Sequence, residues 1–131
     1  MPLENQETAL EWLKRAKSNL ALARQPRTKE IYLEDLCFEA QQAAEKALKA
    51  VLIAKEIPFR YVHDLAELLT LIASAGILIP DAVTKSAGLT EYAVAARYPG
   101  PYEPVTAEEF DQALSCAAAV VHWAEDLISP A

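Results

Sequence analysis

The chain has 131 residues, 53% of them hydrophobic and 24% charged, a balance typical of one soluble globular domain and not of a disordered chain. We therefore treat residues 1–131 as a single domain, long enough to bury a core without disulfides or metals. The formal net charge is −7, which disfavours generic nucleic-acid binding, because such binding depends on cations that neutralise phosphates.

The charge is distributed unevenly along the chain. Residues 1–60 hold ten Lys and Arg against nine Asp and Glu, a balance of +1, and residues 61–131 hold two against ten, a balance of −8. This asymmetry leaves open a ligand in a local cationic groove and a basic protein partner. The N-terminus lacks the apolar core of a secretory signal, and no apolar run approaches the length of a membrane span. We therefore expect a cytoplasmic protein that does not enter a membrane.

The first half of the chain is predicted to form two long helices, because apolar residues recur there at intervals of three and four. The first helix is expected over residues 6–24 and ends before Pro26, since proline cannot continue the hydrogen-bond ladder. The second is the longest, from residue 28 to about residue 56. Its many alanines suit close helix packing, and we expect part of it to serve in dimerisation.

Two shorter helices are predicted next. One begins near Asp64, which has capping-box spacing with Glu67, and stops before Gly76, a natural left-handed terminus. The other is expected over residues 80–96, with a proline in its first turn, where the missing N–H has no cost.

The last helix is predicted to open at a second capping box, formed by Thr106 and Glu109. Short connections between long helices favour antiparallel neighbours. The predicted fold class is therefore all-α, an up-and-down bundle of four to five helices whose core is formed mainly by the first, second and last. Cys37 and Cys116 form no metal-ligand or redox spacing, and we expect two buried, reduced thiols.

The second predicted helix carries a face that departs from its apolar stripe. A surface pair of Glu45 and Lys49 is expected one turn apart. Adjacent glutamines beside a phenylalanine suggest a surface for a protein partner, and an ordinary solvated helix face explains them equally well. The residues of this candidate partner surface are Phe38, Gln41, Gln42, Glu45 and Lys49.

No familiar catalytic or cofactor motif occurs, and no phosphate-binding glycine loop does, since the chain has three glycines. We therefore predict neither a cofactor nor a metal ion. His63 and His122 are the two histidines. His122 shares a helix face with polar residues and is expected on the surface. His63 precedes the cap of the third helix, where a local structural role is favoured over a weak catalytic candidacy.

The stretch "EYAVAARYPGPYEP", residues 91–104, differs from the helical sequence around it. Arg97 ends a helical run there, and a cation in the last turn of a helix can simply satisfy its carbonyls. Alternatively, its planar guanidinium binds phosphate in a bidentate way. Tyr98 and Tyr102 would then stack on a base or supply hydroxyls, and the prolines would restrict the conformations of the segment.

Four stretches, in this order, resemble the HEPN family (higher-eukaryote and prokaryote nucleotide-binding domain). They are "CFEAQQAAEKALKA" at 37–50, "H-D-L-x-x-L" at 63–68, "ARYPGPY" at 96–102 and "VTAEEFDQALSCAAAVV" at 105–121. The resemblance covers nearly the whole chain. It implies a bundle of four to five helices that forms a homodimer.

The resemblance also implies three roles. Many small prokaryotic members pair with a minimal nucleotidyltransferase in a toxin–antitoxin module. Active members cleave RNA without metal, using an arginine followed four to six residues later by a histidine. That histidine serves as general base, and the arginine stabilises charge on the phosphate. Other members are thought to bind nucleotides.

This chain departs from the ribonuclease motif. Arg97 matches the arginine, but Pro101, Tyr102 and Glu103 occupy the positions of the histidine, and a tyrosine is a poor base at neutral pH. The sequence therefore favours a homodimeric module that binds a nucleotide or RNA phosphate and a nucleotidyltransferase-type partner. The alternatives are an active ribonuclease toxin that uses Arg97 with His63 or Tyr102, and a purely structural dimer.

Overall fold

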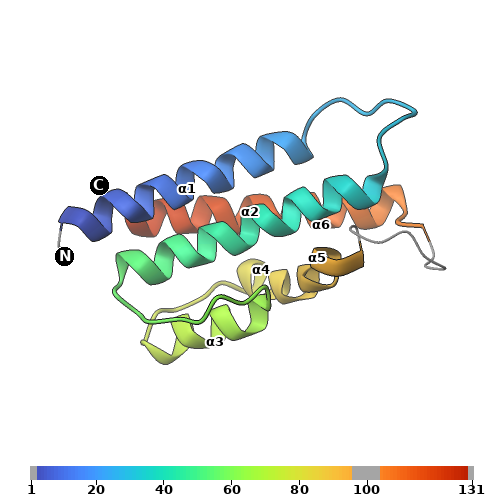
Figure 1. The fold of residues 1–131 in the computed structure, drawn as a ribbon. Coiled ribbons are helices and arrows are strands. Elements are labelled where there is room, and N and C mark those ends of the chain that lie inside the picture. Colours follow the sequence, from blue (N-terminus) through green and yellow to red (C-terminus); the bar gives the residue numbers. More distant parts are fainter. Residues whose placement is uncertain (1–2, 96–103, 130–131) are drawn as a thin grey trace.

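A computed structural model of the chain describes residues 3–95 and 104–129. Three long helices lie side by side, α1 (Leu3–Ala23), α2 (Leu33–Ala54) and α6 (Ala107–Ile128) (Figure 1). The described residues contain no strand. The predicted all-α bundle is therefore confirmed, with the first, second and last helices at its centre.

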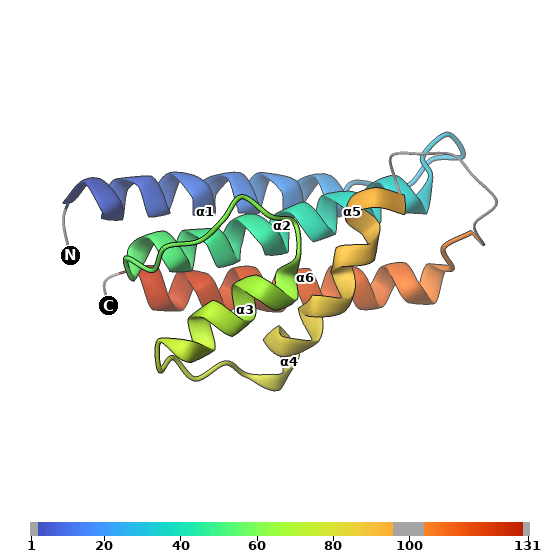
Figure 2. The ribbon, with the colours of Figure 1, turned by 60° about the horizontal axis from the view of Figure 1, so that its bottom comes forward.

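Shorter elements form a second layer. Helix α3 (Leu65–Ser74) is followed by a continuous run of three pieces: α4 (Asp81–Thr84), the 3₁₀ helix η1 (Lys85–Glu91) and α5 (Tyr92–Ala95). Figure 2 shows this run crossing the long helices, from α6 at its beginning to α2 at its end, in agreement with its contacts. It thereby carries the chain to the segment that contains Arg97.

The prediction of one α-helix over residues 80–96 was wrong in its geometry. Four buried side chains of this run, Val83, Ser86, Leu89 and Tyr92, are spaced three residues apart, and Ala93 beside the last of them is buried as well. A 3₁₀ helix has three residues per turn, so this spacing keeps one row of side chains facing the core. Gly88, inside the 3₁₀ stretch, has a low intrinsic preference for the α-helix.

The predicted helix ends agree better with the structure. Thr106 and Glu109 form the complete capping box before α6, and Gly76 has the left-handed backbone expected after α3, with φ of 87°. Asp64 caps α3 by accepting a hydrogen bond from the Ala66 N–H, 3.0 Å away. The predicted box is only half formed there, because Glu67 turns away from the backbone and pairs with an arginine, Arg60.

Helix α2 is the central element, in contact with α1, α3, α5, α6 and η1. Such encirclement requires small side chains, because bulky ones would hold the neighbouring helices apart. Accordingly, six alanines of α2 are buried by their own chain: Ala40, Ala43, Ala44, Ala47, Ala50 and Ala54. The alanines expected at a dimer interface thus pack inside the monomer, and dimerisation itself stays a prediction.

Polar contacts fix α1 against its neighbours. Asn19 on α1 donates to Glu39 on α2 and accepts a hydrogen bond from Lys46, also on α2. Lys17 on α1 pairs with Glu125 on α6. Across residues 3–95 and 104–129, none of the helices combines the length and the apolarity that a bilayer span requires.

Candidate functional site

Three polar side chains of α2 are buried in the interior of the molecule. Gln41, Glu45 and Lys49 are 0%, 4% and 4% exposed, and their spacing of four residues places them on one helix face. The predicted exposed surface was therefore wrong for these three residues, and the expected surface pair of Glu45 and Lys49 is a buried pair. The other two members of the candidate partner surface, Phe38 and Gln42, are half-buried.

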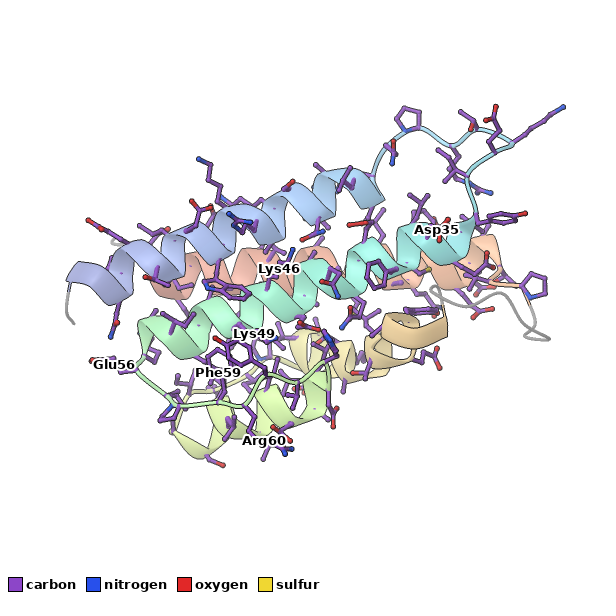
Figure 3. All side chains as sticks on the ribbon, in the orientation of Figure 1. Asp35, Lys46, Lys49, Glu56, Phe59 and Arg60 are labelled. Atoms are coloured by element: carbon purple, nitrogen blue, oxygen red, sulfur yellow. The ribbon has the colours of Figure 1, made fainter. Side chains whose placement is uncertain are left out.

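The chain after α2 folds back and covers this face. We call residues 55–64 the return segment; Figure 3 shows Glu56 where it leaves α2, with Phe59 and Arg60 further along. Helix α2 ends in a Schellman motif, in which Glu56 is left-handed with φ of 57° and the Ile57 N–H donates to the Leu52 carbonyl. This tight end reverses the chain and leads it back along α2.

Glu45 is the centre of the buried polar group. Lys49 Nζ donates to its Oε2 at 2.9 Å, and Gln41 Nε2 donates to its Oε1 at 3.0 Å. His63, at the end of the return segment, places its Nδ1 2.8 Å from the same Oε1. Lys49 Nζ also lies 5.9 Å from the centre of the Trp12 ring, a cation–π distance. We call Gln41, Glu45, Lys49 and His63 the polar cluster.

The cluster keeps Glu45 ionised. Burial is the largest single influence and raises the pKa of this carboxyl group. The hydrogen bonds from Lys49, Gln41 and His63, together with the charge of Lys49, outweigh burial, so the pKa of Glu45 is lowered. An ionised carboxylate only accepts hydrogen bonds. His63 Nδ1 must therefore carry a hydrogen and donate a hydrogen bond to Glu45 Oε1.

His63 is anchored by its backbone as well as by its ring. Gln41 Nε2 makes a longer contact of 3.5 Å to the His63 carbonyl, and Gln42 in turn donates to Gln41 Oε1 at 2.8 Å. Two residues later, the Leu65 N–H donates to Thr90 Oγ1 of η1 at 3.0 Å. Yet the His63 side chain is 57% exposed. The structure thus holds an imidazole at the surface, at the junction of α2, α3 and η1.

Arg97, Tyr98 and Tyr102, predicted to bind phosphate, lie outside the described residues. Both flanks of their segment, residues 96–103, attach to α2. On one side α5, which ends at Ala95, packs against α2. On the other, the Val105 N–H donates to Glu34 Oε1 on the first turn of α2 at 2.8 Å.

The HEPN domain model matches residues 9–127 of this chain. The chain belongs to the HEPN family. The crystal structure of ST0689, an archaeal HEPN homologue, is 28% identical, covers 92% of this chain and 98% of its own, and superposes with a TM-score of 0.73. The crystal structure of TT1696 from Thermus thermophilus is 30% identical, with coverage of 91% and 97% and a TM-score of 0.74. No curated protein matches the chain.

This HEPN domain also has a hollow of about 700 Å³ between α6 and the run α4–η1–α5. Glu91 and Glu109 outnumber Lys85 among its lining residues. Burial, followed by the neighbouring Cys37, Glu91 and Glu109, raises the pKa of Tyr92 to about 12. An acidic lining suits an anionic ligand poorly. The sequence did not indicate this hollow, because its two walls are separate in the chain.

The cysteines of the HEPN domain are unsuited to nucleophilic chemistry. Cys37 is fully buried, and burial, then the charges of Glu34, Glu109 and Glu91, raises its pKa to about 12. Cys116 is only half-buried, contrary to the expectation of two buried thiols; its thiol donates to the Ala82 carbonyl, and burial raises its pKa. Thiols with raised pKa values are protonated and weakly reactive.

His122 lies exposed on α6, as predicted. Among the described residues, no group of three or more His, Cys, Asp and Glu side chains is arranged to hold a metal ion. Among the described residues, the polar cluster is therefore the site best suited to binding or catalysis. The pairing of Glu45 with His63 was not predicted from the sequence. The four-residue spacing of Gln41, Glu45 and Lys49 was the one signal of a shared helix face that the sequence contained.

The buried pair makes a prediction about stability. Glu45→Gln should lower the free energy of unfolding by about 3–5 kcal/mol, because it leaves the Lys49 charge buried without a counter-charge. The double variant Glu45→Gln/Lys49→Met, which removes both charges, should regain most of this loss. Urea unfolding at neutral pH measures both, with Glu30→Gln on the exposed turn before α2 as the matched control.

The sign of the pH dependence follows from the lowered pKa of Glu45. Its stabilisation is fully present above the ordinary glutamate pKa of about 4.3 and is lost as the pH falls through the lower folded value. Below that range the double variant should lose less stability than the wild type does. Parallel loss in both proteins would show that Glu45 is not held ionised by the cluster.

Proposed function

We propose that this HEPN domain is a homodimeric module that binds a nucleotide or an RNA phosphate group at residues 96–103, through Arg97, Tyr98 and Tyr102. The observation that carries the proposal is the attachment of both flanks of this segment to α2 within a HEPN fold. Arg97 is one of two Lys or Arg residues after residue 60. Few other cations in the second half of the chain could therefore bind a phosphate. Its guanidinium offers bidentate hydrogen bonds to phosphate, and tyrosines stack on bases.

Calorimetry with adenosine monophosphate and with a short single-stranded RNA tests this proposal. Arg97→Ala should weaken binding about ten- to a hundredfold, the usual worth of hydrogen bonds to a charged group. Arg27→Ala, in the exposed loop between α1 and α2, removes the same charge elsewhere and should leave binding unchanged. Unchanged binding by Arg97→Ala would instead support the structural role, in which Arg97 caps its helix.

Light scattering tests the homodimer separately and should give twice the mass of the chain.

A minimal nucleotidyltransferase is the protein partner that we propose, as in a toxin–antitoxin module. The resemblance to small prokaryotic HEPN proteins motivates this partner, and the acidic balance of residues 61–131 suits a basic contact surface. Phe38 and Gln42 of the candidate partner surface are half-buried.

Affinity purification of the tagged chain from its native cells, followed by mass spectrometry, tests the partner. A small nucleotidyltransferase should co-elute in near-stoichiometric amount. Reversing charge at an exposed acidic position, Asp111→Lys, should reduce its recovery, whereas Glu30→Lys in the N-terminal half serves as the control. A homodimer that elutes without any nucleotidyltransferase would contradict the toxin–antitoxin assignment and leave the nucleotide proposal in place.

A metal-free ribonuclease is the second candidate function. The observation that favours it is His63, which is exposed and hydrogen-bonded to an ionised carboxylate, an arrangement suited to a general base. In this candidate His63 takes the place of the histidine that is absent after Arg97, and Arg97 stabilises the charged phosphate.

Incubation of the purified protein with single-stranded RNA in the presence of a chelator separates the two functions. Under the binding proposal the RNA stays intact, and expression of the chain alone does not arrest growth. Cleavage that is lost in both Arg97→Ala and His63→Ala, and retained in the control His122→Ala, would replace the binding proposal with the ribonuclease.

A further inference from the structure

We propose that the hollow between α6 and the run α4–η1–α5 binds a small zwitterion, in which an aliphatic chain joins an ammonium group to a carboxylate. The ammonium group lies at Glu91, Glu109 and Tyr92, and the carboxylate lies at Lys85. An ω-amino acid and the C-terminal lysine of a peptide share this chemistry. None of these four residues belongs to the polar cluster or to residues 96–103, so the proposal does not depend on nucleotide binding.

The hollow has the size of a small-molecule site and two chemically different ends. Its volume of about 700 Å³ lies within the usual range of about 300–1,000 Å³. At one end, the Cys116 thiol lies 3.6 Å from the Ala82 carbonyl. Lys85 belongs to this end: burial raises the pKa of the Cys116 thiol, and the charge of Lys85 lowers it. Glu109 lies seven residues before Cys116, about 10 Å along the axis of α6, and lines the other end.

The two glutamates converge on one place at this second end. Besides burial, which is the largest influence, the charges of Glu91 and Glu109 raise the pKa values of both Tyr92 and Cys37. Glu109 accepts a hydrogen bond from the Thr106 N–H in the capping box, but neither glutamate forms an ion pair with any residue that the structure describes. Two neighbouring carboxylates repel each other, and an ammonium group between them would remove this repulsion.

The hydroxyl of Tyr92 is a second and independent indication of a ligand at the same end. Tyr92 is 9% exposed and lines the hollow, yet its hydroxyl has no hydrogen-bond partner within the described part of the chain. Ser86 Oγ is the one fully enclosed side-chain oxygen or nitrogen there that lacks a partner. The Tyr92 hydroxyl is therefore not enclosed and opens into the hollow. Its oxygen can accept a hydrogen bond from an ammonium group.

The remaining lining selects the rest of the ligand. Leu89 and Ala113, which lie between the two ends in their helices, offer apolar surface to methylene groups. Lys85 would repel a second ammonium group, as in a diamine, and would attract a carboxylate. For the same reason the α-ammonium group of free lysine is unfavourable beside it. A zwitterion with its charges at opposite ends of an aliphatic chain therefore matches the whole hollow.

Nitrogen-15 NMR titration of the full chain with 6-aminohexanoate tests the site. The amides of Tyr92, Glu109 and Gln112, which line the hollow, should shift, and those of α1 should not. Hexylamine and hexanoate each lack one charged group and should bind about two- to fivefold more weakly, the worth of one partly exposed ion pair. Nα-acetyl-lysine, which carries its two charges as a C-terminal lysine does, distinguishes the sources: tighter binding than that of 6-aminohexanoate assigns the site to a peptide, and weaker binding to a free ω-amino acid.

Charge-only variants test the residues. Glu91→Gln/Glu109→Gln should weaken binding of 6-aminohexanoate about tenfold, the worth of two such ion pairs. The capping box can persist in this variant, because glutamine also serves at its third position. The matched control Glu30→Gln/Glu108→Gln changes the net charge equally at exposed positions that do not line the hollow, and should bind as the wild type does.

Two further variants separate the ends of the hollow. Tyr92→Phe, which removes only the hydroxyl, should weaken binding about two- to tenfold, the worth of one hydrogen bond. Lys85→Gln should abolish the preference for 6-aminohexanoate over hexylamine. Equal binding of these two ligands by the wild type would overturn the proposal, and so would equal weakening in the double variant and its control, since net charge alone would then explain the binding.

Discussion

The encirclement of α2 is the constraint on which the rest of the structure depends. A helix in contact with α1, α3, α5, α6 and η1 has almost no side open to solvent, so its side chains must be small or paired. Alanines meet the first requirement where the neighbouring helices approach closely. The polar residues on the remaining face must meet the second, because a buried group without a hydrogen bond costs free energy.

That requirement explains why a charged pair and an exposed histidine occur together. Covering α2 with the return segment removes Glu45 and Lys49 from water, which is tolerable because each finds partners within one helical turn or across the segment. The left-handed Glu56 at the end of α2 directs the segment back over them. The histidine is thus oriented by the element that buries its carboxylate, and packing and site chemistry are two consequences of one chain reversal.

The structural features that depend on a few neighbouring residues were predicted correctly from the sequence. The capping box of Thr106 and Glu109 and the left-handed Gly76 each depend on a few neighbouring residues, and both occur as expected. The burial of Gln41, Glu45 and Lys49 depends instead on residues 55–64, and periodicity within α2 contains no information about that cover. The prediction of an α-helix over residues 80–96 failed for a related reason. The 3₁₀ helix η1 there packs against α2, α3 and α6, which are distant in the sequence.

The two candidate contact groups, Arg97 and His63, come from different parts of the chain, whereas the ribonuclease motif of the family places both in one short stretch. A shared stretch fixes the distance between arginine and histidine locally, through the backbone that joins them. Here the described flanks of the Arg97 segment and His63 contact α2 through separate elements, so no shared stretch of backbone joins the two residues. In-line displacement at phosphate demands close alignment of the base with the reacting hydroxyl. The lack of a shared stretch is therefore the physical reason for which we propose binding in preference to cleavage.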